Sequence, residues 1–474
     1  MKRHAFEPLS LSAFAITAAA VLSAGTVHAQ TSATWANPSG TNPFQWTTGS
    51  NWTVTSGTGS YPNGVDSAAT FTNPGLGYTI DLVASSASTI TIGSLAASFN
   101  ANKALEITSG TLNFATSTGT PTLSWSSSVG GPIIVLNNVS ITGSQGLVVM
   151  GSPNMGTSLR TYSGTNWSGF SGSVALTQGN WDPQTANAAP TNSDLILGGT
   201  DATNVANDTH VARFGLFGGK NQTVGALIGG SGSYLSNNST TSVTTLTIGN
   251  NNDSGTFAGN IGKQTNGQPT GSGGDINVVK TGTGTETFSG TDVYTGSTTV
   301  NAGTLAITGS IDSKTVTVNS SGTLAGTGSI AGGVTLNGGI INLVDGSTGT
   351  LTIGNGLTLS SGQMDFEIGA GGASDLINVT SGSVSATNPI TVNITGLSGF
   401  GAGTYNLIGG TSSGLGNLAL GTTPGGGFGY QLLSSSTGEQ LVVTTAAVPE
   451  PATFGLVAVG AASLMLVSRR KRLA

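Results

Sequence analysis

Short apolar runs, bounded by glycine and small polar residues, recur along almost the whole chain. Within most runs apolar and polar residues alternate, which is the period-2 pattern of a half-buried β-strand. Outside the two ends of the chain, no amphipathic run follows the 3.6-residue period of a helix. The sequence therefore predicts an elongated all-β body made of many short strands. Examples of the runs are Ile90-Thr91-Ile92, Leu105-Glu106-Ile107, Leu112-Asn113-Phe114 and Leu195-Ile196-Leu197.

Between residues 300 and 372 the runs follow a fixed spacing. Each run lies in a segment that opens with an asparagine, and successive asparagines are separated by the same interval: Asn301, Asn319, Asn337 and Asn355. This interval of 18 residues fits one coil of a β-solenoid, in which each coil stacks on the next. We therefore predict a parallel β-helix in which the equivalent asparagines form a hydrogen-bonded ladder. Coincidence in an Asn-rich chain is the alternative for the ladder.

The N-terminus has the three parts of a secretory signal peptide. A basic start precedes a largely apolar stretch over 9–24, and Val27-His28-Ala29 fits a cleavage site with small residues. We predict a signal helix within residues 1–29, with signal peptidase cutting between Ala29 and Gln30. An acid and a proline separate the basic and apolar parts. A short uncleaved anchor is therefore the alternative.

The C-terminus carries a second three-part signal over residues 448–474. A tetrad opens it, namely Val448, Pro449, Glu450 and Pro451. An uncharged stretch follows, from Ala452 to Ser468. As a helix this stretch measures about 25 Å, slightly less than a bilayer core of about 30 Å. A basic cluster ends the tail, namely Arg469, Arg470, Lys471 and Arg472. Because Lys and Arg resist translocation, the chain before Pro449 is expected to face outside.

Taken together, these residues resemble the PEP-CTERM sorting signal of Gram-negative bacteria. The resemblance implies that Pro449-Glu450-Pro451 is the motif read by an exosortase-type sorting enzyme. It also implies a C-terminal transmembrane sorting helix that holds the chain in the inner membrane before processing. A plain membrane anchor and a buried apolar helix are the alternatives.

Composition limits the partners of the body between these two ends. Charged residues make up 7% of the chain, against roughly 25% in ordinary globular domains, and Gly accounts for 76 of 474 residues. The body keeps seven basic and 17 acidic residues, a net charge of about −10. Such a surface repels nucleic acid, so we predict no nucleic-acid partner. The chain has no cysteine, which excludes disulfides and thiolate metal sites.

One segment of the body has a distinctive order of motifs. Val279-Lys280-Thr281-Gly282-Thr283-Gly284 is followed by Ser289-Gly290, Tyr294-Thr295-Gly296 and Asn301-Ala302-Gly303-Thr304-Leu305. This order resembles the autotransporter-associated β-strand repeat, which implies an exported β-helical protein. Glu286 and Thr287 depart from the pattern, because they replace the usual apolar-polar-apolar strand before Phe288. We therefore expect a β-bulge or a weaker strand there.

All six tryptophans lie in the N-terminal part of the body, between Trp35 and Trp181. Trp46 and Trp52 belong to the group nearest the start of the body, and this region looks like the opening of exported β-helical proteins. Bulky aromatic residues there can plug the open end of a solenoid. A tryptophan face can also stack on a sugar. We prefer the cap and keep a glycan site as the alternative.

These features divide the chain into five parts. They are a signal peptide (1–29), a Trp-containing solenoid region and cap (30–245), the β-strand repeat region (246–398), a C-terminal β cap (399–447) and the sorting signal (448–474).

Residues that could carry out acid–base chemistry are scarce. His210 is the only histidine of the body, and we interpret it as a surface-loop residue. Asp365 and Glu367 lie two apart, hence on one strand face, and Asp375 follows; such carboxylates serve polysaccharide lyases and hydrolases. A lyase also needs cations for an acidic sugar, yet the sequence has none from residue 315 to 468. We therefore predict no enzymatic activity and no cofactor.

Two glycine-rich segments have a weak likeness to ligand-binding loops. Gly371-Gly372-Ala373-Ser374-Asp375 lacks the third glycine of a calcium-binding nonapeptide, so solvated turn residues are the preferred interpretation and adventitious calcium binding stays open. Gly282-Thr283-Gly284 is followed by no predicted helix that could bind a phosphate, so we expect a plain turn.

The sequence as a whole predicts an exported, non-enzymatic β-solenoid with a structural or adhesive role at the cell surface or in the extracellular matrix. The alternative is a polysaccharide-active or glycan-binding β-helix protein, for which extracellular polysaccharide is the partner.

Overall fold

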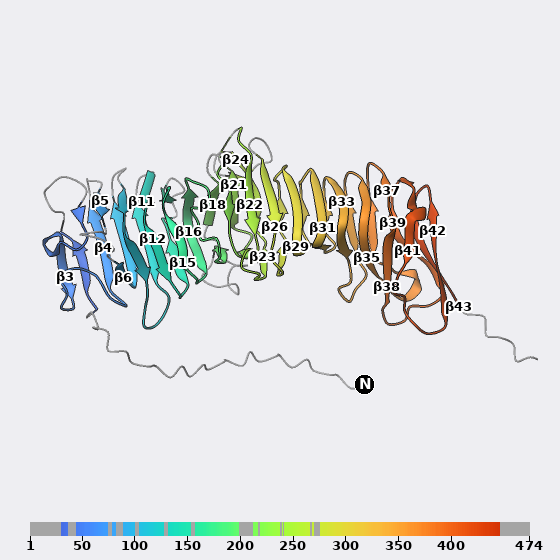
Figure 1. Cartoon of the computed structure of the whole chain (residues 1–474), viewed down its shortest axis with the longest axis horizontal. Coiled ribbons are helices and arrows are strands. Elements are labelled where there is room, and N and C mark those ends of the chain that lie inside the picture. The colour runs from blue at the N-terminus through green and yellow to red at the C-terminus, as the bar shows by residue number, and fades with distance from the viewer. Residues whose placement is uncertain are drawn as a thin grey trace, which may run out of the picture.

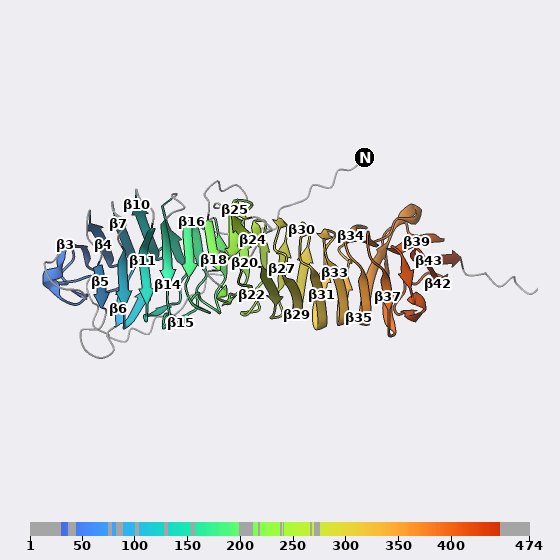
Figure 2. The same cartoon turned by 90° about the horizontal axis from the view of Figure 1, so that it is seen from above.

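The described part of the chain is a long stack of β-strands. The computed structural model describes residues 30–36, 44–73, 78–81, 89–99, 104–127, 131–152, 157–198, 212–216, 219–237, 239, 241–265, 268–269 and 275–445. The stack runs from β3 (Trp52–Ser56) at one end to β42 (Phe428–Ser435) and β43 (Gly438–Thr445) at the other (Figures 1 and 2). The predicted all-β fold is confirmed.

Three short 3-10 turns have all their residues in the described part of the chain, namely η1 (Gly49–Asn51), η4 (Ala370–Gly372) and η5 (Leu415–Asn417). None of the described helices has the length and apolar character needed to cross a bilayer. The predicted signal helix and the predicted transmembrane sorting helix lie outside the described residues.

Each coil places strands on three faces of the stack. The first face holds β1 (Ser32–Trp35), β4 (Ala68–Asn73), β7 (Ser94–Phe99), β10 (Thr122–Ser127), β13 (Leu147–Met150), the start of β16 (Val174–Pro183), β17 (Leu195–Leu197), β20 (Leu227–Gly229), β23 (Gly255–Phe257), β27 (Thr285–Phe288), the second halves of β29 (Ser297–Ile307), β31 (Thr315–Ala325), β33 (Gly333–Asn342) and β35 (Leu357–Ile368), then β38 (Ile390–Gly396) and β41 (Leu418–Leu420).

The second face holds β2 (Phe44–Gln45), β5 (Tyr78–Asp81), β8 (Leu105–Thr108), β11 (Gly131–Asn137), β14 (Thr157–Thr161), the end of β16, β18 (Ala212–Leu216), β21 (Ser233–Asn237), β24 (Asn260–Thr265) with β25 (Gln268–Pro269), β28 (Thr291–Asp292), β30 (Ser310–Ile311), β32 (Ser329–Ile330), β34 (Thr350–Ile353), β36 (Leu376–Val379), β39 (Gly403–Gly409), β43 and β42.

The third face holds β6 (Thr89–Ile92), β9 (Thr111–Phe114), β12 (Ser140–Gly143), β15 (Asn166–Phe170), β19 (Gln222–Thr223), β22 (Thr244–Ile248), β26 (Ile276–Lys280), the first halves of β29, β31, β33 and β35, then β37 (Val384–Ala386) and β40 (Ser412–Ser413).

Successive coils pair in parallel and in register, as a solenoid requires. Val300 pairs with Val318 and Val318 pairs with Leu336, so each of these coils is as long as the asparagine spacing. The next coil is longer, because Leu336 pairs with Leu359. The added length lies in the connection between β33 and β34, which spans residues 343–349. The strands keep their stacking while a connecting loop absorbs the extra residues.

The core lies inside the coils and follows the alternation of each strand. In β31, Val316, Val318 and Leu324 are fully buried, while Thr317 between the two valines is half-buried. The main core cluster extends from Ala33 to Val443, so residues 30–445 contain a continuous core of their own. Burial of a Val or Leu side chain stabilises the folded state by roughly 1.5–3 kcal/mol, and every coil adds such side chains to the core.

The asparagine ladder forms over three of the four predicted positions. The Asn319 amide donates to Oδ1 of Asn301 at 2.8 Å, and the Asn337 amide donates to Oδ1 of Asn319 at 3.1 Å. Asn355 precedes β35, and Ser361 occupies the position paired with Asn337. The prediction was wrong for Asn355, because the longer connection before β34 shifts the regular asparagine spacing away from the stacking register.

Antiparallel strands close both ends of the stack. At the N-terminal end β3 pairs antiparallel with β1. At the C-terminal end β43 pairs antiparallel with β39, and β42 pairs antiparallel with β43. On one face at each end, the parallel pairing therefore stops on a strand that runs the other way.

The core and the ladder are expected to contribute very differently to stability. Replacement of the buried Leu324 in Leu324→Ala should lower the free energy of unfolding by about 2–5 kcal/mol, because it leaves a cavity. Asn319→Ala removes exposed hydrogen bonds and should lower it by no more than about 1 kcal/mol. Urea unfolding followed by circular dichroism measures both. A larger loss in Asn319→Ala than in Leu324→Ala would contradict this assignment.

Candidate functional site

Most residues of the two predicted processing signals lie outside the described part of the chain. This applies to Ala29 and to the sorting residues Val448, Pro449, Glu450, Pro451, Arg469, Arg470, Lys471 and Arg472. Gln30 is the first described residue, and its amide donates to the carbonyl of Asp66 at 3.1 Å. His210 also lies outside the described residues.

The N-terminal tryptophans form a packed cluster. Trp35, Trp46 and Trp52 are all buried, and the ring centroids of Trp35 and Trp52 lie 4.9 Å apart in an edge-to-face arrangement. The Trp46 indole donates to the carbonyl of Pro62 at 2.9 Å, and the Trp52 indole donates to the carbonyl of Trp46 at 2.7 Å. The faces of these rings and the donors of Trp46 and Trp52 are therefore used within the protein, which is the arrangement expected of a cap.

Asp365 and Glu367 lie on one side of β35, but each is bound to different groups. Oδ1 of Asp365 accepts from the amides of Gln363 and Asn393, at 2.7 and 2.8 Å. Oε2 of Glu367 accepts from the backbone N–H groups of Asp345 and Gly346, at 3.0 and 2.8 Å. Glu367 thus holds the connection between β33 and β34 against the coil.

Asp375 anchors the far end of the connection between β33 and β34, at Gly349. Its carboxylate accepts from the backbone N–H of Gly349 at 2.8 Å and from that of Glu367 at 2.7 Å. Burial raises the pKa of Asp375 to about 6, the two backbone hydrogen bonds oppose the rise, and the charges of Glu367 and Asp345 add to it. Asp375 therefore faces the backbone rather than the glycine turn at Gly371. Within the described residues, no group of three acidic or histidine side chains could hold a metal ion.

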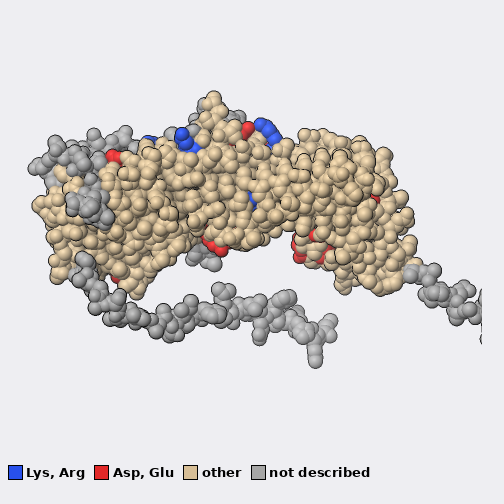
Figure 3. Space-filling view, in the orientation of Figure 1, with Lys and Arg blue, Asp and Glu red and all other residues tan. Residues whose placement is uncertain are grey.

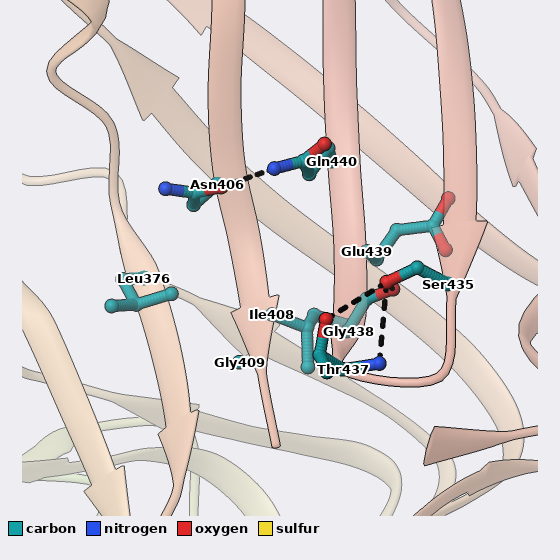
Figure 4. Close-up of a pocket in the computed structure, with 9 residues that line it drawn as sticks. All are labelled: Leu376, Asn406, Ile408, Gly409, Ser435, Thr437, Gly438, Glu439 and Gln440. Carbon is teal, nitrogen blue, oxygen red and sulfur yellow. Dashed lines mark hydrogen bonds between the residues drawn. The ribbon is translucent and has the colours of Figure 1, made fainter. Parts of the chain in front are cut away.

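A cavity of about 200 Å³ lies beside the C-terminal hairpin (Figure 4). It is lined by Leu376, Asn406, Ile408, Gly409, Ser435, Thr437, Gly438, Glu439 and Gln440. Gln440 donates to Asn406 at 2.8 Å, and the hydroxyls of Ser435 and Thr437 lie 3.1 Å apart. Figure 4 shows the Glu439 carboxylate directed away from Asn406. The cavity is smaller than the roughly 300–1,000 Å³ of typical small-molecule sites, and several of its polar groups bond to one another.

Inside the repeat, several ionisable side chains point into the core, namely Lys280, Glu286 and Asp292. Lys280 is buried, and its ammonium donates to the carbonyls of Thr281 at 2.6 Å, Gly282 at 3.1 Å and Ala302 at 3.4 Å. Burial lowers the pKa of Lys280, and the charge of Glu286 opposes that effect. Because Ala302 belongs to the next coil, Lys280 ties two coils together.

The turn after Lys280 requires glycine. Gly282 has φ +65°, and a Cβ there would lie 1.9 Å from the carbonyl oxygen of Gly249. At Gly303, with φ +63°, a Cβ would lie 2.9 Å from the Lys280 ammonium. The Gly-x-Gly motif is therefore a tight turn around a buried lysine, which agrees with the expectation of a turn and explains its composition.

Glu286 is buried in a regular strand, so the expected bulge was wrong. β27 pairs with β23 and β29 without a break in register. Glu286 stands opposite Gly255, whose missing side chain leaves room for the carboxylate. Oε2 of Glu286 accepts from the backbone N–H of Leu227 at 3.2 Å. The glutamate thus fits the core because it supplies an acceptor to a strand two coils away.

Burial raises the pKa of Glu286 to about 8. The hydrogen bond from Leu227 and the charge of Lys280 lower it, and the charge of Asp194 raises it. The buried Glu286 carboxyl therefore holds a proton over part of the neutral pH range.

Asp292 and Tyr294 complete the buried polar set of the repeat. Oδ1 of Asp292 accepts from the backbone N–H of Ile261 at 2.7 Å, and burial raises the pKa of Asp292. The Tyr294 hydroxyl lies 2.8 Å from that of Thr298, which donates to Ser313 at 3.0 Å. Asp292 thus links β28 to the preceding coil through Ile261, and the hydroxyls of Tyr294, Thr298 and Ser313 form a buried chain of hydrogen bonds.

Comparison with known families finds two matches at the segments that the motifs marked. Residues 447–472 match the PEP-CTERM protein-sorting motif, and residues 278–307 match the passenger-associated-transport-repeat. The chain carries both a PEP-CTERM sorting motif and a passenger-type repeat. The predicted resemblance is confirmed, and the two matches indicate an exported, cell-surface-directed protein whose tail is processed by an exosortase-type system. No curated protein sequence matches the chain.

The burial of Lys280 and Glu286 could have been predicted from the sequence by strand alternation. Lys280 lies two residues after the buried Val278, and Glu286 lies two residues before the buried Phe288. Strand alternation alone therefore places both side chains inside the coil.

Glu286 is expected to make stability depend on pH. Its carboxyl has a pKa near 8 in the folded chain and 4.5 ordinarily. Between these values the unfolded chain releases a proton that the folded chain keeps, so stability should fall as pH rises from about 4.5 to 8. Glu286→Gln cannot ionise and should show a smaller decrease across that interval.

Urea unfolding of both proteins at several pH values measures the difference. Asp253→Asn is the matched control, because it removes an exposed carboxylate. The same pH slope in Glu286→Gln as in the unmodified protein would show that Glu286 does not retain the proton.

Proposed function

We propose that this chain is a non-enzymatic surface or extracellular-matrix protein of a Gram-negative-type bacterium, with a structural or adhesive role. The match of residues 447–472 to the sorting motif carries the proposal, because it gives the chain a destination outside the cell. Signal peptidase cuts between Ala29 and Gln30, the C-terminal helix holds the chain in the inner membrane, and an exosortase-type enzyme acts at Pro449-Glu450-Pro451.

The extent of the solenoid supports this route. β1 begins at Ser32, two residues after the proposed cleavage site, and β43 ends at Thr445, just before the sorting match begins. The folded body thus fills the interval between the two signals. A rod that consists almost wholly of stacked coils suits display at a surface, where reach and rigidity matter more than a reactive centre.

The acids and tryptophans considered for other functions have structural partners. The Asp365 carboxylate accepts hydrogen bonds from side-chain amides. The carboxylates of Glu367 and Asp375 accept hydrogen bonds from backbone N–H groups. Trp46 and Trp52 are buried. These contacts favour a structural role over a polysaccharide-active site on β35 and over a sugar-stacking surface at the N-terminal cap.

Replacement of the sorting motif should change where the protein stops. In Glu450→Ala we expect the chain to keep its tail and to remain with the inner-membrane fraction, whereas the unmodified chain reaches the surface or medium. Cell fractionation, with mass spectrometry of the mature C-terminus, reports both effects. Pro389→Ala, an exposed body position, is the control. Normal processing of Glu450→Ala would contradict the proposed route.

A further inference from the structure

We propose that copies of this chain associate head to tail, with the edge strand β42 of one copy pairing with the edge strand β3 of the next. This inference goes beyond the proposed function, because it concerns assembly of the body and does not depend on how the tail is processed. The partner is a second copy of the same chain.

Among the described residues, each end of the stack has a strand with one unpaired edge. Among the described strands, β3 pairs only with β1, and β42 pairs only with β43. Each outer edge therefore offers a row of backbone N–H and C=O groups. Soluble proteins usually protect such an edge with charged residues, proline or a β-bulge. β3 and β42 contain no charged residue and no proline. β42 keeps an unbroken register with β43 over eight residue pairs, whereas the pairing of β3 with β1 has one irregularity, between Ser32 and Ala33.

β3 and β42 also carry exposed apolar side chains. Val54 on β3 is 40% exposed and Leu433 on β42 is 49% exposed. In β3 the residues after Trp52 are all exposed, and β42 alternates half-buried and exposed residues over its first six positions. Both edges thus combine free backbone groups with apolar side chains, which is the composition of a surface that accepts an added strand.

The distribution of charge favours contact between ends. Residues 30–65 contain no charged residue, and residues 376–445 contain only Glu439, which is 1% exposed. The charged side chains visible in Figure 3 lie between the two ends of the rod. With a net charge of about −10, two bodies repel each other side by side, whereas their ends approach with little repulsion.

Head-to-tail pairing uses the β3 edge and the β42 edge of every copy. Pairing of β42 with β42 would instead close a two-fold dimer and leave both β3 edges free. A heterologous contact between the two different ends does not close and continues as a filament. Up to five residue pairs are available, because β3 has five residues and β42 has eight.

The test uses residues 30–445, which contain the whole described core. Light scattering should show particle masses that grow with concentration, and electron microscopy should show rods whose lengths are multiples of one body.

Lysine substitutions that prevent strand pairing at one end give two blocked forms. One is Val54→Lys on β3, and the other combines Gln431→Lys with Leu433→Lys on β42. Each blocked form alone should remain a monomer, and a mixture of the two should yield dimers and nothing longer.

Val243→Lys is the control, because Val243 is 53% exposed and lies near the middle of the rod. It should assemble like the unmodified body, and circular dichroism should confirm that every variant is folded. Monomers at all concentrations would overturn the proposal. Dimers formed by Val54→Lys alone would also overturn it, since they would show β42 pairing with itself.

Discussion

Parallel pairing between successive coils is the interaction on which the structure depends. A single coil cannot enclose a core by itself, because each of its strands is short and its faces are single layers. Stacking supplies backbone partners on both sides and places Val300, Val318 and Leu336 over one another. The inward alternation of every strand then extends one core along the rod. Connections between strands vary in length because they lie outside this register.

The repeat adds a second constraint, since it puts ionisable groups into that core. Lys280, Glu286 and Asp292 are buried, and each bonds to backbone groups of a neighbouring or more distant coil. A buried polar group without a hydrogen-bond partner is destabilising, so these contacts favour the observed stacking of the coils. The segment that matches a known repeat thus contains buried polar residues that link coils, as the buried Arg213–Asp182 ion pair does between β18 and β16.

Sequence reasoning succeeded where a single periodicity determines the structure. Alternation and the regular asparagine spacing predicted the all-β solenoid, and they placed Asn301, Asn319 and Asn337 in a ladder. They failed at Asn355, because the length of a loop is not constrained by strand pairing. The bulge expected at Glu286 was also wrong, because Gly255 in the adjacent strand makes room for its side chain. That compensation depends on residues far apart in the sequence, which one strand pattern does not reveal.

Deletion of one complete coil tests the stacking account most directly. Removal of residues 301–318 joins Val300 to Asn319, so the next coil enters the stack in the same register. The shortened body should keep a β-rich circular dichroism spectrum and unfold cooperatively in urea. Removal of only residues 301–309 rotates all later strands onto the wrong faces and should abolish cooperative unfolding. Equal tolerance of both deletions, or equal loss of structure in both, would contradict the account.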